Sequence, residues 1–236
     1  MKLKVIYIGL ALLFIVRHLS IADEGMWIPM LLEQLNEEEM QAMGMNITAE
    51  DIYSVNQSSM KDAVVLFGRG CTGGIISENG LLLTNHHCGF SQIQKHSSVA
   101  NDYLTDGFWA MSPEEELPNR GLTATMMKEM REVTNEVLNG VKDNMTTAQR
   151  NALINENAKA LVEDFEKDSP YQSFVRPFFE GNKYYMIIVE IFKDIRLVGA
   201  PPSNIGKFGG DTDNWMWPRH TGDFSLFRIY VGPDGR

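Results

Sequence analysis

The amino-acid sequence predicts a β structure with helical additions, and three observations support this fold class. Short apolar runs at residues 63–67 and 81–83 are bounded by glycine-rich or Asn-Gly segments, a pattern typical of strands joined by tight turns. Apolar side chains recur at helical spacing among Glu and Gln between residues 27 and 43. A stretch rich in Glu, Lys, Met, Asn and Ala predicts a helical insertion at about 125–167.

The predicted strands begin with residues 63–67. A hairpin follows, and its turn is expected at Ser77-Glu78-Asn79-Gly80 because Asn-Gly is a strong hairpin signal. The mainly apolar and aromatic segments 184–192 and 224–231 predict two further buried strands. We find no internal repeat and no low-complexity linker, so the length fits one or two domains.

The predicted helices have recognisable ends. Pro29 lies near the start of the first helix, where proline is tolerated. A second short helix is expected from Thr48, because acidic residues follow it in the first turn. The helical insertion should break near Gly140, and either Thr146 or Thr147 is placed to cap its second half.

Residues 1–22 are typical of an export signal. Lys2 and Lys4 precede an apolar run over 5–16, and small residues follow at 20–22, so we expect a signal peptide at 1–22 and a mature chain from Asp23. The apolar run is shorter than the roughly 20 residues that a membrane-spanning helix needs. We therefore expect an exported protein with no retained membrane anchor.

Composition and charge exclude two classes of protein. With 236 residues, 44% of them hydrophobic, the chain can bury a substantial core, which argues against intrinsic disorder. The formal net charge is -10, and loss of the three basic residues of the signal peptide reduces 21 basic residues to 18 against 31 acidic ones. Because such a chain repels phosphate backbones, we expect no nucleic-acid partner.

Cys71 and Cys88 are the two cysteines of the chain. In an oxidising compartment they are expected to form one disulfide, which closes a loop of about 17 residues and stabilises the fold by about 3 kcal/mol. Two free buried thiols are the alternative. A metal site made by His86, His87 and Cys88 is disfavoured, because neighbouring side chains on a strand point to opposite faces. We predict no metal and no cofactor.

A histidine at the end of a strand, beside a cysteine tethered to the preceding strand, is a candidate general base. The region from Cys71 to Cys88 has this arrangement, with the hairpin in between. Such a histidine is held rigidly, as a base must be to accept a proton at hydrogen-bonding distance. The alternative is a histidine with a purely structural role.

The second candidate segment is residues 210–223, which ends with Asp223 at the start of the last predicted strand. A carboxylate fixed there can orient an imidazole through its second nitrogen and stabilise the imidazolium. Other interpretations remain. Asp211 and Asp213 could be calcium ligands, although the full twelve-residue loop is missing. Trp215 and Trp217 could be core aromatic residues, which is the favoured interpretation for Trp217, and Asp223 could be a turn or capping residue.

The two segments resemble chymotrypsin-like peptidases, and in particular the bacterial dipeptidyl-peptidases 7 and 11. The most specific matches are Thr84-Asn85-His86-His87-Cys88-Gly89 and the run from Phe208 to Phe224. The resemblance covers nearly all of 23–236. It implies a chymotrypsin-like double β-barrel catalytic domain, of which only the N-terminal part is present, and places the C-terminal barrel and a large helical domain outside this sequence.

The resemblance also assigns roles to residues. His87 is the general base, with His86 facing the other way, and Asp223 is the acid that orients it. Asn214 and Trp215 match the positions that hold the N-terminal ammonium of the peptide substrate. An amide carbonyl can accept a hydrogen bond from an ammonium, and an indole ring adds a cation–π contribution of about 0.5 to 2 kcal/mol.

The nucleophile is expected elsewhere. In the family the serine lies hundreds of residues further on, in a Gly-x-Ser-Gly type turn, and no serine of this chain has that context. We therefore expect a partial chain that is inactive alone.

The activity that the resemblance implies is release of dipeptides from the free N-terminus of oligopeptides. It places the enzyme in the periplasm or at the surface of a Gram-negative bacterium, and the full-length enzyme can form a homodimer. A non-catalytic peptide-binding relative and a metal-dependent hydrolase are the alternatives.

Overall fold

The computed structural model describes residues 27–206 and 222–232, and the chain divides into two compact units. The first unit comprises residues 1–49 and the second comprises residues 50–236. The predicted signal peptide lies outside the described residues. Within the part of the chain that is described, no helix combines the length and the apolar character needed to cross a bilayer.

The first unit is helical, as the spacing of its apolar residues predicted. Its helices are η2 (Pro29–Leu31), α2 (Leu32–Leu35) and α3 (Glu37–Ala42). The expected single helix is interrupted at Asn36, whose backbone leaves the helical region at φ -137°. A further short helix, α4 (Ala49–Ile52), begins one residue after Thr48, with its first residue in the first unit and the others in the second.

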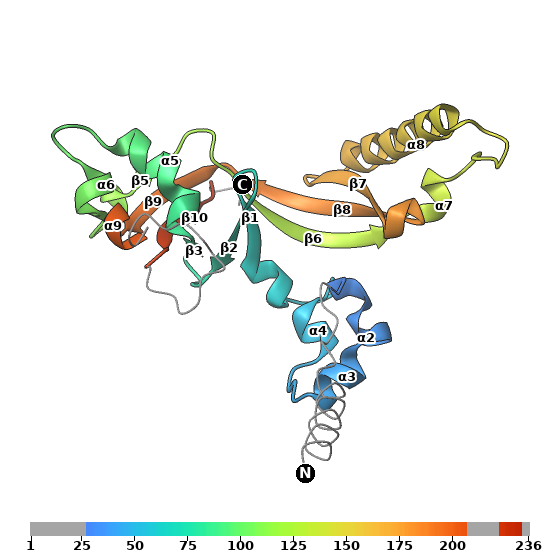
Figure 1. Cartoon of the computed structure of the whole chain (residues 1–236), viewed down its shortest axis with the longest axis horizontal. Coiled ribbons are helices and arrows are strands. Elements are labelled where there is room, and N and C mark those ends of the chain that lie inside the picture. Colours follow the sequence, from blue (N-terminus) through green and yellow to red (C-terminus); the bar gives the residue numbers. More distant parts are fainter. Residues whose placement is uncertain (1–26, 207–221, 233–236) are drawn as a thin grey trace, which may run out of the picture. The chain divides into compact units, whose positions relative to one another are not determined.

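The second unit is built on an antiparallel sheet, which confirms the predicted β structure with helical additions. Its strands are β1 (Val64–Phe67), β2 (Cys71–Ile75), β3 (Leu81–Thr84), β4 (Phe108–Trp109), β5 (Leu117–Pro118), β6 (Ala124–Glu132), β7 (Gln172–Phe178), β8 (Lys183–Phe192), β9 (Asp194–Ala200) and β10 (Ser225–Tyr230). Among the described residues they are hydrogen-bonded in the order β4-β9-β10-β3-β2-β1-β6-β8-β7, and β5 also pairs with β9. Strands β9, β10 and β3 can be followed side by side in Figure 1.

The hairpin formed by β2 and β3 confirms the turn predicted at residues 77–80. The N–H of Gly80 donates to the carbonyl of Ser77 over 3.2 Å, and the Ser77 hydroxyl accepts the N–H of Leu81 over 3.1 Å. Gly80 has φ +67°, a left-handed conformation that favours glycine. The turn thus leads β3 back along β2 and sets the direction in which the chain reaches residue 85.

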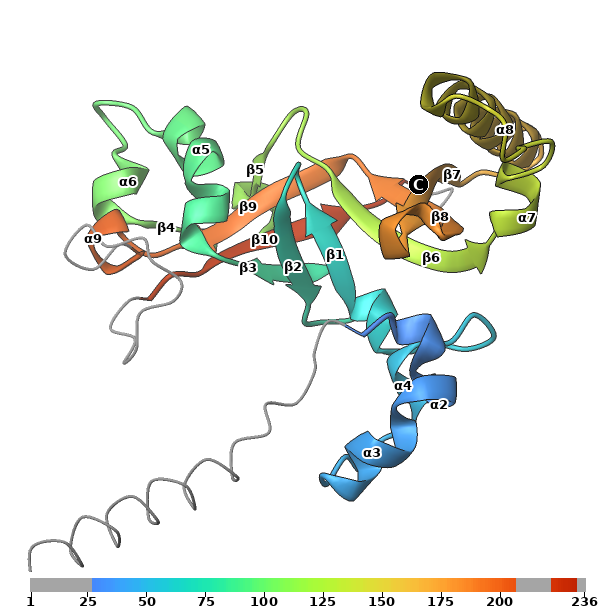
Figure 2. The same cartoon turned by 45° about the vertical axis from the view of Figure 1, so that its right-hand side comes forward.

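The remaining helices of the second unit are short except for two. They are η3 (Met60–Ala63), α5 (His86–His96), α6 (Tyr103–Asp106), η4 (Pro113–Glu115), α7 (Thr134–Val137), α8 (Thr147–Lys167), η5 (Phe179–Gly181) and α9 (Ser203–Gly206). Helices α5, α6 and α9 contact one another and lie at the end of the sheet where β4, β9 and β10 meet, as Figures 1 and 2 show.

The prediction of a helical insertion at about 125–167 is wrong for residues 125–132. Residues 124–132 form β6, which pairs with β1 on one side and with β8 on the other. Met, Lys, Glu and Arg favour helix by only a few tenths of a kcal/mol each, so two long-range strand pairings outweigh them. The helix proper is α8, and Gly140, at φ +77°, lies in the connection that precedes it.

Besides β6, strands β4, β5, β7 and β9 were not predicted. In β9 the burial alternates along Asp194–Ala200, so a signal of period two was present in Ile195, Leu197 and Gly199 and was overlooked. Strand β7 has only weak alternation because it forms an edge of the sheet and is hydrogen-bonded to β8 alone among the described strands. Its place is decided by pairing with β8 and by contact with α8.

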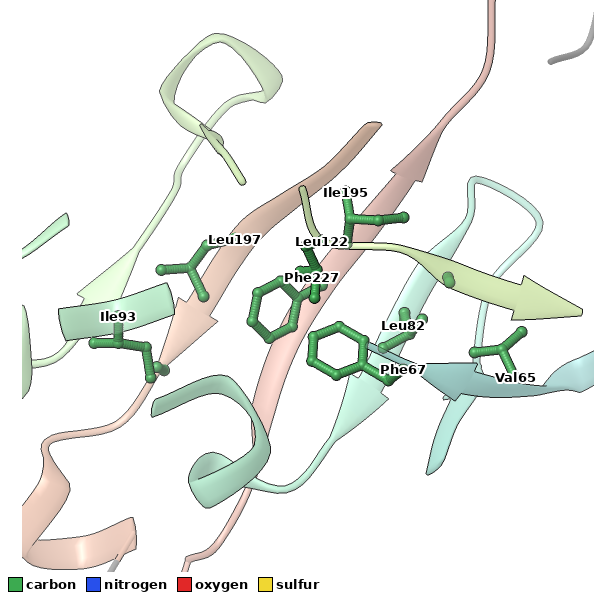
Figure 3. Close-up of a cluster of buried hydrophobic side chains, with 10 residues drawn as sticks. Val65, Phe67, Leu82, Ile93, Leu122, Ile195, Leu197 and Phe227 are labelled. Atoms are coloured by element: carbon green, nitrogen blue, oxygen red, sulfur yellow. The ribbon is translucent and has the colours of Figure 1, made fainter. Parts of the chain in front are cut away.

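The main core is formed by residues of strands β1, β3, β6, β9 and β10 and of helix α5. Figure 3 shows the rings of Phe67 of β1 and Phe227 of β10 next to each other; their centroids are 4.7 Å apart and their planes are tilted by 53°. Leu82 of β3 and Ile93 of α5 are fully buried in the same cluster. Helix α5 is therefore fixed to the sheet by apolar packing on its inner face.

The structure predicts that Thr146, and not its neighbour Thr147, determines the stability of the start of α8. The N–H of Gln149 donates to the Thr146 hydroxyl over 3.3 Å, and the Gln149 side chain accepts the N–H of Thr146 over 3.0 Å. Replacing Thr146 by Ala should weaken this end of α8 by about 1 kcal/mol. Hydrogen exchange at the amide of Gln149 should then become faster, whereas T147A, the matched control, should leave it unchanged. Equal rates in both variants would contradict the assignment of the cap.

Candidate active site

Helix α5 begins directly after β3 and carries both adjacent histidines in its first turn. Asn85 precedes it with extended backbone, at φ -69° and ψ 152°. The expectation that a histidine stands at the end of a strand is therefore wrong, because both histidines lie in a helix. Successive helical residues still diverge by about 100° around the axis, so the imidazoles of His86 and His87 point in different directions.

His87 lies against Asp223, which is 136 residues further along the chain. The ring nitrogen Nδ1 of His87 is 2.7 Å from Oδ2 of Asp223, and the backbone N–H of His87 donates to Oδ1 over 3.0 Å. The side chain of Asp223 is 7% exposed, whereas that of His87 is 30% exposed. The pair is thus buried on its carboxylate side and open on its imidazole side.

The contact determines which ring nitrogen of His87 is available for chemistry. A carboxylate only accepts hydrogen bonds, so the proton of the neutral imidazole lies on Nδ1. The nitrogen Nε2 then keeps its lone pair. None of the hydrogen bonds of the described residues involves Nε2 of His87, so this atom can accept a proton from a group that approaches it.

Asp223, two residues before β10, also caps α5. Its Oδ1 accepts the N–H of His87, the second residue of the helix, and an anion at a helix N-terminus is stabilised by the helix dipole. Burial alone raises the pKa of Asp223. This effect is outweighed by the backbone and side-chain hydrogen bonds from His87, by electrostatic attraction to the His87 ring and by the hydrogen bond from Asn85, so the pKa is lowered. The carboxylate is therefore held in its ionised form.

Two contacts hold α5 in place near this pair. The disulfide between Cys71 and Cys88 joins the first residue of β2 to the third residue of α5, with the Cα atoms 6.1 Å apart. The next residue, Gly89, lies so close to β10 that an added Cβ would be 2.7 Å from Oγ of Ser225 and 3.1 Å from the ring of Phe227. A glycine is required here, because a methyl group would push α5 away from β10, the strand that Asp223 precedes by two residues.

His86 faces away from Asp223. It is fully buried, its Nε2 is 3.1 Å from Oγ of Ser203 in α9, and Gly206 packs against its ring. The ring of His87 lies against a carboxylate and is partly exposed, whereas the ring of His86 is buried beside Ser203. The structure thus separates the pair into one buried residue and one residue that can meet a substrate.

The profile described as Peptidase S46 matches residues 22–236. The chain belongs to the peptidase S46 family. It is 54% identical to an Asp/Glu-specific dipeptidyl-peptidase of Flavobacterium psychrophilum over 225 residues, which are 95% of this chain and 32% of that protein. It is 45% identical to dipeptidyl-peptidase 7 of Porphyromonas gingivalis over 239 residues, covering 100% and 33% of the two chains.

Solved structures agree with this assignment. The crystal structure of Porphyromonas endodontalis DPP11 matches with a TM-score of 0.79 and 45% sequence identity, over 91% of this chain and 31% of that one. This S46 chain therefore spans about a third of the length of the relatives it matches.

Other residues of this S46 chain have different outcomes. Asn214 and Trp215 lie outside the described residues, so their role stays a prediction. Cys88 is half of a disulfide and thus not a thiolate ligand. Among residues 27–206 and 222–232, no group of three His, Cys, Asp or Glu side chains is arranged to hold a metal ion.

Sequence reasoning missed the supporting residues of the site. Asn85 and Ser225 were given no role, although Asn85 stands where a strand ends and a helix begins, a position at which Asn is common. Gly89 is part of the motif, and the close approach of α5 to β10 explains why this position needs a glycine. These roles depend on distances between strands that are far apart in sequence.

The lowered pKa of Asp223 predicts how its contribution to stability varies with pH. Because the folded pKa lies below the usual value of about 3.9, the ionised carboxylate stabilises the fold above that value and loses this effect as the pH falls through the folded pKa. The urea midpoint of the wild type should exceed that of D223N at pH 5 to 7, and the difference should shrink towards pH 3. A difference that stays constant down to pH 3 would contradict the prediction.

Removal of the disulfide should destabilise the chain by about 3 kcal/mol, because the bond closes a loop of 17 residues in the unfolded state. The urea midpoint of the double variant C71S/C88S should be lower than that of the oxidised wild type. The wild type measured with a reductant should show the same lowered midpoint. The double variant itself, with no thiols, should be indifferent to reductant and is the control. A wild-type midpoint that does not respond to reductant would refute the prediction.

Proposed function

We propose that this chain supplies the general base, His87, and its orienting carboxylate, Asp223, to a serine-type dipeptidyl-peptidase. The enzyme would release dipeptides from the free N-terminus of oligopeptides. The observation that carries the proposal is the 2.7 Å contact between Nδ1 of His87 and Oδ2 of Asp223, combined with a partly exposed imidazole.

The geometry suits both proton transfers of acyl transfer. Nε2 of His87 would take the proton of a serine hydroxyl as the oxygen attacks the carbonyl carbon of the second peptide bond. The same nitrogen would then give that proton to the leaving amine, so that a dipeptidyl ester of the serine remains. Water would hydrolyse the ester by the same two transfers, and Asp223 would stabilise the imidazolium each time.

The serine is assigned to the region that the relatives possess outside the part matched here. The relatives are about three times as long as this chain, which leaves ample sequence for a nucleophile and its oxyanion hole. We use the term full-length protein for these 236 residues together with that region.

The substrate class rests on the relatives and on two residues of the motif. Several relatives are named dipeptidyl-peptidases, and DPP11 of Porphyromonas endodontalis has been solved with the dipeptides Arg-Glu and Arg-Asp. We assign Asn214 and Trp215 to the N-terminal ammonium of the peptide. An enzyme that cuts two residues from an amine needs such an anchor to place the second peptide bond at the nucleophile.

We also assign the protein to the periplasm or the cell surface, after removal of residues 1–22. The disulfide between Cys71 and Cys88 supports this location, because such bonds persist in oxidising compartments. Homodimer formation of the full-length protein stays a prediction.

The proposal is tested by kinetics of the full-length protein on an oligopeptide with a free N-terminus. H87A and D223N should each lower kcat by about 10^4-fold or more, because the first removes the base and the second favours the wrong tautomer. A serine-directed reagent should abolish activity, and a chelator should leave it unchanged. The 236 residues alone should release no dipeptide.

The matched control is D164N, which removes a carboxylate from the exposed face of α8 and should retain wild-type kcat. Dipeptide release by the 236 residues alone, or wild-type activity in both H87A and D223N, would overturn the proposed function. Binding of peptides without turnover by the full-length protein would instead identify a non-catalytic peptide-binding relative.

A further inference from the structure

Asn85 contacts the carboxylate of Asp223 directly. Its side-chain Nδ2 donates to Oδ2 of Asp223 over 3.1 Å and lies 3.3 Å from the backbone carbonyl of the same residue. The oxygen Oδ2 is also the one that faces Nδ1 of His87. One carboxylate oxygen thus receives a hydrogen bond from the proposed base and another from Asn85.

The side chain of Asn85 is not used for the purpose that its position suggests. Asn85 is the N-cap of α5, and Asn at this position usually accepts a backbone N–H of its own helix. Here its side chain makes no such bond, and Asp223 accepts the N–H of His87 in its place. Asp223 thus caps the helix, and the side-chain amide of Asn85 donates to the carboxylate of Asp223.

The backbone of Asn85 is held firmly enough to aim this amide. Its carbonyl accepts the hydroxyl of Ser225 over 2.9 Å and the N–H of Gly89 over 3.2 Å. Ser225 is fully buried in β10, two residues after Asp223. Donor and acceptor thus lie next to the same two elements, α5 and β10.

We propose that Asn85 is a positioning residue of the active site, which holds Oδ2 of Asp223 in the orientation that the Nδ1 proton of His87 requires. The inference rests on the proposed function and deepens it. A carboxylate with one oxygen on the His87 backbone N–H and the other shared by Asn85 and the imidazole cannot rotate about its Cβ–Cγ bond without breaking a hydrogen bond. Asn85 therefore acts on the reaction through Asp223 and His87.

The test is kinetics of the full-length protein carrying N85A or N85D. N85A removes one hydrogen bond to a charged group, so kcat should fall by about 10- to 100-fold while KM stays within about twofold. N85D keeps the shape of the side chain and adds a negative charge beside the pair. Because this charge favours the imidazolium, the acid limb of the kcat/KM profile should move to higher pH by about one unit.

The matched control is N182D, which adds the same charge in the turn between β7 and β8 and should leave both kcat and the acid limb unchanged. A change in folding alone would alter the unfolding midpoint without moving the acid limb, so the pH profile separates positioning from a structural role. The circular dichroism of each variant should match that of the wild type.

The outcomes also separate this inference from the proposed function. Loss of activity in H87A and D223N, with wild-type kcat in N85A, would overturn the role of Asn85 and leave the proposed function standing. Wild-type activity in H87A and D223N would overturn both. A fall in kcat with a raised acid limb in N85D is the result that supports the inference.

Discussion

The hydrogen bonds between Asp223 and the first turn of α5 are the constraint on which the rest of the site depends. They join residues 136 positions apart, and the sheet makes this possible because Thr84 of β3 pairs with Ser225 of β10. Antiparallel pairing then places the residues after Thr84 opposite the residues before Ser225. The meeting of His87 with Asp223 is therefore a consequence of strand register, and a register shift would separate them.

Three kinds of interaction keep α5 in the position that this contact needs. The disulfide to Cys71 fixes the helix to β2, apolar packing of Ile93 fixes its inner face, and Gly89 allows it to approach β10 without a side chain in between. Gly89 and Ile93 are four residues apart and share one face of α5, and Cys88 lies about 100° around the axis from Gly89. Together they reduce the freedom of the imidazole, which is what preorganisation of a general base requires.

The electrostatics of the site follow from the same arrangement. A buried carboxylate is costly unless it is hydrogen-bonded, and Asp223 is bonded to His87 and Asn85 and lies at a helix N-terminus. These contacts lower its pKa despite burial. The ion that orients the imidazole is thus stabilised by the helix that carries the imidazole, and no separate cation of the described residues has to be recruited for it.

Local signals in the sequence were enough to predict the helical character of residues 29–42, the turn at residues 77–80, the cap of α8 to within one residue and the strand at 184–192, because each depends on neighbouring residues. The strand at 124–132 was mistaken for helix, since only its pairing with β1 and β8 overrides its composition. For the site, sequence motifs predicted His87 and Asp223 as candidates, but neither motif contains the distance between them. That distance, and with it the hydrogen bond from Asn85, was decided by tertiary structure, because it depends on how two strands far apart in the chain align.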